Sequence, residues 1–270
     1  MFKTNSLISI ATLFSVIIFM VTSGGCKKDD EFNGRQATYT LQVKDVLGVT
    51  GTATFNETST SSTSIDLVLM GAASGTHPAE LRMNSAVEGG GVVVTLNPVD
   101  ANGKSSTNVT TLSYDQLIAY DGFIQVHQSS SELNVIIAQG DIGGNVITST
   151  NITYMLDTVG TFNVKGSALF AKRVNGNTLV TITLTGTIPG ATYPATINLG
   201  SIASIGGGPV VKTLNNVEGT MGTCYTNIRQ LDSGLDITYD NWLVYDGYIN
   251  IYQTSVSLGN VICHGNIGSN

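Results

Sequence analysis

Three histidines, His77, His127 and His264, are the side chains of this chain whose type best suits proton transfer or metal binding. Both kinds of chemistry draw on histidines and carboxylates that the fold gathers into a cluster. The acidic residues that could join them, such as Glu80 and Asp141, have no spacing typical of metal ligands. We therefore expect no metal site and no cofactor, and we assign no catalytic residue.

Two glycine-rich segments, Gly89–Gly91 and Gly206–Gly208, have the composition of a phosphate-binding loop. Such a loop needs a helix directly after it, because the first turn of the helix supplies the amide groups that bind the anion. β-Branched residues follow both segments, which favours loops or hairpin turns. The Asp-Gly pairs that begin at Asp121 and Asp246 precede alternating segments, so we interpret them as turns as well.

The chain contains an internal repeat. The segment Tyr120–Val126 returns as Tyr245–Ile251, and Gly140–Gly143 returns as Gly265–Gly268. A period of roughly 115–125 residues is too long for a solenoid repeat and matches the size of a whole domain. We therefore expect two tandem domains, at residues 37–147 and 148–270.

The repeat also bears on the histidines, because no histidine is shared by the two copies. The residues that stand at the positions of His77, His127 and His264 in the other copy are Tyr193, Tyr252 and Gln139. A histidine site common to both domains is therefore excluded. A site assembled between the two domains remains an open alternative.

The first 25 residues have the pattern of a signal peptide. Lys3 is followed by an apolar segment from Leu7 to Val21, which is shorter than the roughly 20 residues that a membrane-spanning helix needs. Small residues then precede Cys26, as in a lipobox, although Ser23 replaces the usual leucine. We expect Cys26 to carry acyl chains such as palmitate, which would anchor the protein in a membrane. The alternative is an ordinary secretory signal with an incidental cysteine.

Residues 26–36 read as a flexible tether. Their segment Lys27–Glu31 resembles the sorting signal that sends some bacterial lipoproteins to the outer face of the outer membrane. We therefore expect a lipid-anchored protein of the cell envelope that is exposed on the cell surface.

Charged residues make up 11% of the chain, and its formal net charge is −7. A nucleic-acid-binding surface needs a basic patch, and the sequence contains none. Cys224 and Cys263 both lie in the second copy, and in an oxidising compartment such a pair suggests a disulfide. Two buried free thiols are the alternative.

The periodicity of apolar residues predicts strands. Polar and apolar residues alternate from Val180 to Leu184, and no segment holds a helical period over three turns. Single helical turns are expected at Tyr114–Leu117 and at Ser129–Leu133, the latter with a capping box. Each copy would contain seven or eight short strands. We expect an all-β protein of two antiparallel β-sandwich domains of Greek-key type.

One face of the strand after each Tyr-Asp-Gly segment carries aromatic and amide side chains. Such side chains suit sugar stacking or protein contact. The alternative is that this face packs against a loop or against the other domain. The candidate binding residues are Phe123, Gln125, His127, Tyr248, Asn250 and Tyr252.

Three segments of the first copy together resemble the CHRD (chordin-type) domain family: Pro78–Arg82, Asp121–His127 and Ala138–Gly143. Members of that family carry Pro-Ala-His-x-His, then Tyr-Val-Asn-Val-His, then Gly-x-Ile-x-Gly. The resemblance covers the first copy and, more loosely, the second. It implies an extracellular β-rich module with a binding function.

The chain departs from the family pattern at its histidines. The first two fall on Glu80 and Arg82 in the first copy, and on Thr196 and Asn198 in the second. Only His127 keeps the third. We expect a cell-envelope lipoprotein that acts as a non-catalytic binding or adhesion module for a glycan or protein. A metal-dependent or hydrolytic enzyme with a site between the domains, and a purely structural envelope component, are the alternatives.

Overall fold

The structure is a computed structural model that describes residues 34–254 and 257–270. The expected signal peptide, most of the tether and Cys26 lie outside these residues. In the described part, none of the helices is long and apolar enough to cross a membrane.

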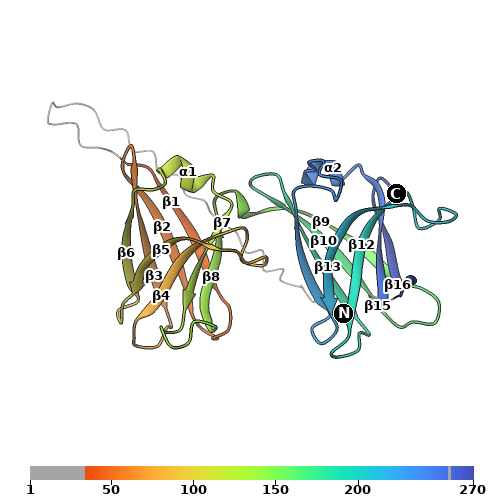
Figure 1. Ribbon diagram of the computed structural model, residues 1–270, viewed down its shortest axis with the longest axis horizontal. Coiled ribbons are helices and arrows are strands. Elements are labelled where there is room, and N and C mark those ends of the chain that lie inside the picture. Colours follow the sequence, from red (N-terminus) through yellow and green to blue (C-terminus); the bar gives the residue numbers. More distant parts are fainter. Residues whose placement is uncertain (1–33, 255–256) are drawn as a thin grey trace, which may run out of the picture. The chain divides into compact units, whose positions relative to one another are not determined.

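The regular structure of the described chain is nearly all antiparallel strand, so the expected all-β fold is confirmed (Figure 1). The strands are β1 (Gln36–Val43), β2 (Thr50–Ser59), β3 (Ser62–Met70), β4 (His77–Met83), β5 (Val92–Val99), β6 (Lys104–Val109), β7 (Gly122–His127), β8 (Ile136–Ile142), β9 (Ile147–Thr158), β10 (Lys165–Arg173), β11 (Thr178–Thr185), β12 (Thr192–Leu199), β13 (Val210–Glu218), β14 (Thr223–Ile228), β15 (Asp246–Thr254) and β16 (Ser257–Gly268). The helical segments are α1 (Tyr114–Ile118), η1 (Gly143–Asn145) and α2 (Tyr239–Trp242).

The two copies share one strand order. In the first copy it is β5-β4-β7-β8-β1-β2-β3-β6, and the second copy repeats this order with each strand number raised by eight. The second copy is a closed barrel because β13 and β14 pair at Glu218 and Thr223. At the corresponding place in the first copy, the amide of Asp100 donates to the carbonyl of Lys104 over 2.9 Å, without a strand pairing. Each copy thus encloses its core within one curled sheet, which refines the expected pair of facing sheets.

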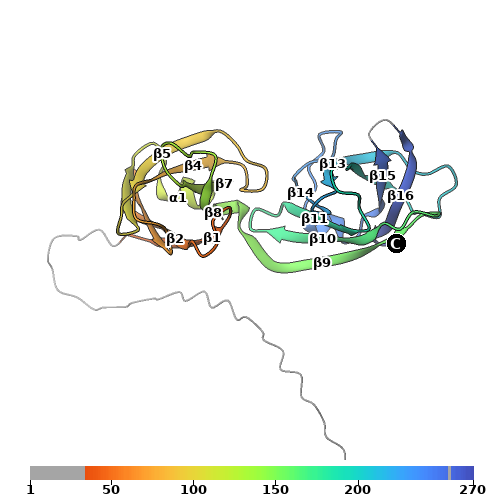
Figure 2. The same ribbon diagram turned by 90° about the horizontal axis from the view of Figure 1, so that it is seen from below.

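Each copy has a separate hydrophobic core, and no residue belongs to both. Figure 2 shows the strands of each copy curling around an interior of their own. The alternation predicted from the sequence explains how the cores are filled. Along β3, Ile65, Leu67 and Leu69 are buried while Asp66 and Val68 face outward. An eight-stranded sheet of this kind leaves an interior that side chains can fill completely.

The single helical turn predicted at Tyr114 is confirmed as α1, which has a capping box between Ser113 and Gln116. Its counterpart α2 has the same box between Thr238 and Asn241. The helical turn predicted at Ser129–Leu133 is wrong, because this segment forms turns. The hydroxyl of Ser129 bonds the hydroxyl of Ser131 over 3.0 Å instead of capping a helix.

Candidate functional site

The six residues of the candidate binding face are all buried, with exposed fractions from 1% for Phe123 to 8% for Gln125 and Asn250. Loops of the same copy cover them. His127 bonds the carbonyl of Leu133 through Nδ1 over 2.6 Å, and the hydroxyl of Tyr248 accepts from the amide of Gly208 over 2.9 Å. In the structure this face therefore packs against loops, which was the alternative to a binding surface. These residues form no open surface in the described chain.

In the first copy this face carries a charged polar row, which we define as Glu80, Arg82, Gln125 and His127. Arg82 Nη1 donates to Glu80 Oε2 over 2.5 Å, and the same oxygen lies 3.4 Å from His127 Nε2. Arg82 Nε also donates to the carbonyl of Gly90 over 2.9 Å. The row therefore fixes the loop between β4 and β5 to the sheet.

In the second copy the same face carries a neutral polar row, which we define as Thr196, Asn198, Asn250 and Tyr252. Thr196 donates to Asn198 Oδ1 over 2.7 Å, and its hydroxyl lies 3.2 Å from that of Tyr252. Asn198 Nδ2 donates to the carbonyl of Gly208 over 2.9 Å. Hydroxyl and amide groups thus hold the equivalent loop without any charge.

The histidines do not come together. His77 has its two ring nitrogens 2.7 Å from the carbonyl oxygen of Gln128 and 3.0 Å from that of Ala73. Partial burial lowers the pKa of His264, while nearby Asp157 opposes this shift. Among the residues that the structure describes, no group of three or more His, Cys, Asp or Glu side chains could hold a metal ion.

The disulfide expected between Cys224 and Cys263 is wrong in this structure, where both are free thiols. They lie on β14 and β16, and β13, β12 and β15 lie between these strands around the barrel. Both thiols belong to the second hydrophobic core. Burial raises the pKa of Cys224 to about 11 and that of Cys263 to about 12, so both stay protonated at neutral pH.

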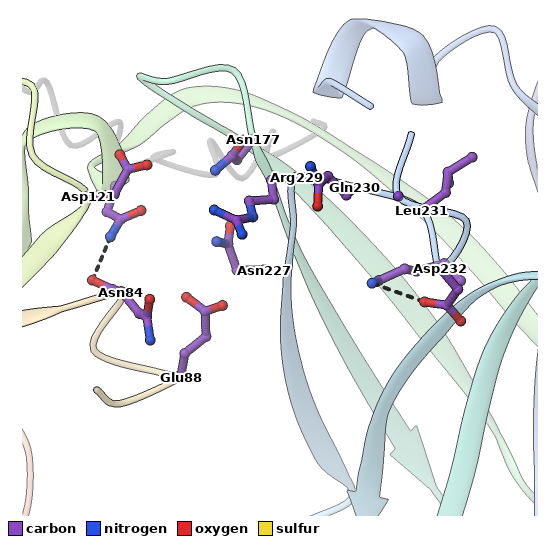
Figure 3. Close-up of a pocket in the computed structure, with 12 residues that line it drawn as sticks. Asn84, Glu88, Asp121, Asn177, Asn227, Arg229, Gln230, Leu231 and Asp232 are labelled. Atoms are coloured by element: carbon purple, nitrogen blue, oxygen red, sulfur yellow. Dashed lines mark hydrogen bonds and ion pairs between the residues drawn. The ribbon is translucent and has the colours of Figure 1, made fainter. Parts of the chain in front are cut away.

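An open polar cavity of about 500 Å³ is present in the described chain (Figure 3). This volume lies within the range of roughly 300–1,000 Å³ found for small-molecule sites. The lining residues are Asn84, Glu88, Asp121, Asn145, Asn177, Lys212, Asn227, Arg229, Gln230, Leu231, Asp232 and Gly234.

Turns and loop segments of both copies position this lining. Asn84 and Glu88 lie on the loop between β4 and β5, and Asp121 lies directly before β7. The loop is held in shape because Glu88 Oε2 accepts from the amide and hydroxyl of Ser85, over 3.1 and 2.5 Å. On the other side Arg229 follows β14 (Figure 3).

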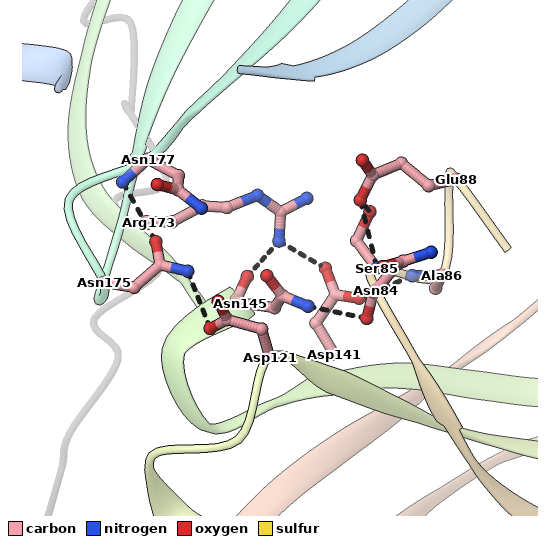
Figure 4. A network of polar contacts seen from close by, with 10 residues as sticks. All are labelled: Asn84, Ser85, Ala86, Glu88, Asp121, Asp141, Asn145, Arg173, Asn175 and Asn177. Carbon is pink, nitrogen blue, oxygen red and sulfur yellow. Dashed lines mark hydrogen bonds and ion pairs between the residues drawn. The ribbon is translucent and has the colours of Figure 1, made fainter. Parts of the chain in front are cut away.

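A buried arginine links the cavity to the segment between the copies (Figure 4). Arg173 has an exposed fraction of 0% and donates through Nη1 to Asp141 Oδ2 over 2.8 Å and to the carbonyl of Asn145. Asp141 Oδ1 also accepts from the amide of Ala86 over 2.7 Å. Asn145 Nδ2 in turn donates to the carbonyl of Asn84 over 2.6 Å. This network holds the first-copy wall of the cavity.

Several buried polar atoms at this site have no hydrogen-bond partner within the described chain. They are Oδ1 of Asn145, Oδ1 of Asn227, and Nε and Nη2 of Arg173. Asn145 is 1% exposed and lines the cavity. Unpartnered buried polar atoms are uncommon in proteins and point to bound water or ligand atoms.

Sequence reasoning missed this cavity. Asp121 was interpreted only as a turn residue, and Asp141 only as a carboxylate without ligand spacing. Asn227 and Arg229 lie where β14 gives way to a loop, and nothing in their local pattern separates them from ordinary surface residues. Arg173 offered one signal, since an arginine at the end of a β-rich apolar segment needs a partner when it is buried.

The comparisons with known proteins add no family. No protein-family model matches the chain, and no curated protein matches it either. The resemblance to the CHRD family therefore stays a prediction.

Proposed function

We propose that this protein is a non-catalytic binding module of the cell envelope, built from two tandem CHRD-like domains behind a lipid anchor. The observation that supports binding is the polar cavity, two of whose lining residues, Asn145 and Asn227, each have a buried side-chain oxygen without a partner in the described chain. A partner with polar groups of its own would satisfy them, because a buried donor or acceptor without a partner is unfavourable.

Arrays of glycans and of envelope and extracellular proteins, probed with the full chain, test this function. The proposal expects saturable binding to a ligand that is recovered chemically unchanged. Absence of binding on both arrays, or conversion of the ligand, would contradict it. Alanine variants of the originally predicted face, such as Tyr252→Ala, are poor probes here, because the side chain is buried and its removal would report on folding.

The lipid anchor is a separate part of the proposal, supported by the lipobox-like residues before Cys26. Metabolic labelling with palmitate should mark the wild-type chain in the outer membrane fraction and leave Cys26→Ser unlabelled. A soluble, unlabelled wild-type chain would refute the anchor and its placement at the cell surface.

One observation favours a second candidate, a hydrolase with its site between the copies. Glu88 and Asp121 both line the cavity, and paired carboxylates are the usual machinery of glycoside hydrolysis. Incubation of the full chain with the bound glycan decides between the two. New reducing ends that disappear in Glu88→Gln would establish the hydrolase, and an intact glycan would leave the binding module.

A further inference from the structure

The chemical character of the cavity narrows the class of ligand, on the assumption that the proposed binding function holds. Its lining contains five side-chain amides, three carboxylates and two cationic groups, with Leu231 as the one large apolar side chain. An amide presents a donor and an acceptor side by side. A hydroxyl group is also both donor and acceptor, so an amide-rich wall matches a ligand rich in hydroxyl groups.

Two of the charged lining groups already neutralise each other. Lys212 Nζ lies 3.1 Å from Asp232 Oδ1, and Asp232 Oδ2 accepts from the amide and hydroxyl of Thr213, each over 2.7 Å. Asp121 Oδ1 accepts from Asn175 Nδ2 over 2.8 Å. The carboxylates are therefore held by the protein itself, and the cavity presents no concentrated charge of one sign.

This balance disfavours ions as the ligand. A phosphate or sulfate would face the carboxylates of Glu88 and Asp121, whereas a divalent cation would face the guanidinium group of Arg229. Neither ion can avoid a like charge across the cavity, and like charges at such range are unfavourable. A neutral ligand meets no such opposition.

The opposite walls provide paired hydrogen-bonding groups for neighbouring hydroxyls. In Figure 3, Asn177, Asn227 and Arg229 point across the cavity toward the wall that carries Asn84 and Asp121. Asn227 lines the cavity with a side-chain amide whose buried Oδ1 has no partner in the described chain, and the planar guanidinium of Arg229 offers several donors in a fixed geometry. One hydroxyl can bond the amide of Asn227 while its neighbour accepts from Arg229.

We propose that this cavity binds one edge of a neutral saccharide, through pairs of neighbouring hydroxyl groups on the sugar. The first contacts are Asn227 and Arg229 on one wall and Asp121 on the other. The lining contains no aromatic side chain, so ring stacking contributes nothing and hydrogen bonds that compete with water carry the affinity. The expected Kd for a single site is weak, on the order of 1 mM.

The first copy provides a matched control. Asn108 on β6 is the counterpart of Asn227 on β14, because Asn108 precedes Val109, which pairs with Thr63, and Asn227 precedes Ile228, which pairs with Thr178. Asn108 is exposed and lies outside the cavity. Asn108→Ala therefore makes the same chemical change at the same strand position without touching the site.

NMR titrations of the ¹⁵N-labelled full chain, followed through its own amide chemical shifts, test the proposal. The probes are neutral oligosaccharides of glucose, galactose, mannose or xylose, with an oligoglucuronate, inorganic phosphate and Ca²⁺ as comparison probes. At least one neutral oligosaccharide should bind saturably. Arg229→Ala and Asn227→Ala should each raise its Kd by about tenfold, which corresponds to about 1.4 kcal/mol, and Asn108→Ala should leave it unchanged. Both cavity residues reach the surface or lie half-buried, so these variants should fold.

Three results would overturn the proposal: binding of oligoglucuronate, phosphate or Ca²⁺ alone, binding of a neutral saccharide with the same Kd in all variants, or no saturable binding by any probe. The array experiment separates these failures from failure of the general function. If a ligand on either array still binds the full chain, the proposed binding function is retained and only the neutral saccharide is ruled out as its ligand. If no array ligand binds either, the proposed binding function is contradicted as well.

Discussion

The two copies place polar groups at the same positions of their sheets and use different chemistry there. The first copy uses an ion pair between Glu80 and Arg82, while the second uses the neutral pair Thr196 and Asn198. In both, a side chain of the row donates to a loop carbonyl, that of Gly90 or Gly208, over 2.9 Å. The fold thus requires a satisfied hydrogen bond at this place and does not require charge.

The hairpin formed by β10 and β11 differs from its counterpart, formed by β2 and β3, in both the burial and the charge of one residue. Glu57 pairs with Thr63 and Lys172 pairs with Thr178, so Thr58 stands where Arg173 does. Thr58 is exposed and bonds Ser62, whereas Arg173 is buried against Asp141. The first copy has no counterpart of the buried arginine, so the shared fold does not need one. The buried arginine of the second copy lies next to the cavity.

The largest effect on this comparison is expected from Arg173→Met. Removal of the guanidinium leaves Asp141 as a mostly buried carboxylate without its cation, and such a loss costs roughly 3 kcal/mol of unfolding free energy. Urea unfolding of the full chain measures it. The counterpart variant Thr58→Ala should change stability by less than about 0.5 kcal/mol. Equal effects of the two variants would contradict the distinction between the hairpins.

A smaller effect is expected when the charged polar row is converted to the neutral one. Glu80→Thr alone should cost about 1–2 kcal/mol, because the half-buried Arg82 loses its carboxylate. The double variant Glu80→Thr with Arg82→Asn should cost less than the single one, since it recreates the second copy's pair. Urea unfolding of both single variants and the double variant completes the cycle. A double variant that is at least as destabilised as Glu80→Thr alone would show that the two rows are not equivalent.

The smallest effect concerns the two cysteines, whose protection from labelling can be tested without any substitution. At pH 8 a thiol alkylating reagent should leave Cys224 and Cys263 unmodified in the folded chain. Both side chains are buried, and their raised pKa values keep them in the unreactive protonated form. After unfolding without reductant, both should be labelled, as peptide mass mapping can show. Protection that persists until reductant is added would indicate a disulfide.

The same thiols predict a decline of stability in alkaline solution. Their folded-state pKa values lie above the ordinary value of 9.0, so the folded chain keeps protons that the unfolded chain releases. The stabilisation is therefore complete below about pH 9 and is lost as the pH rises toward 11 and 12. The variant Cys224→Ser with Cys263→Ala carries the residues of the counterpart positions in the first copy, Ser105 and Ala138, and should lose less stability over this range.

The sequence predicted what depends on local pattern and repetition. Alternation around Ile65 and Leu67 specified buried strands, and the helical turn predicted at Tyr114–Leu117 is α1, although its cap at Ser113 was not predicted. Ring closure through Glu218 and Thr223 could not be predicted, because at the same place in the first copy Asp100 and Lys104 form a backbone hydrogen bond without a strand pairing. The cavity was also out of reach, since it gathers Asn84, Asp121 and Arg229 from distant loops.

Native-state hydrogen exchange of the full chain in increasing urea tests most directly the claim that each copy folds around its own core. Amides of β1–β8 should converge on one opening free energy and amides of β9–β16 on another. Trp242→Ala, which removes a fully buried side chain of the second core, should lower only the second value by about 3–5 kcal/mol. One common opening free energy for all sixteen strands, lowered throughout by Trp242→Ala, would contradict the account.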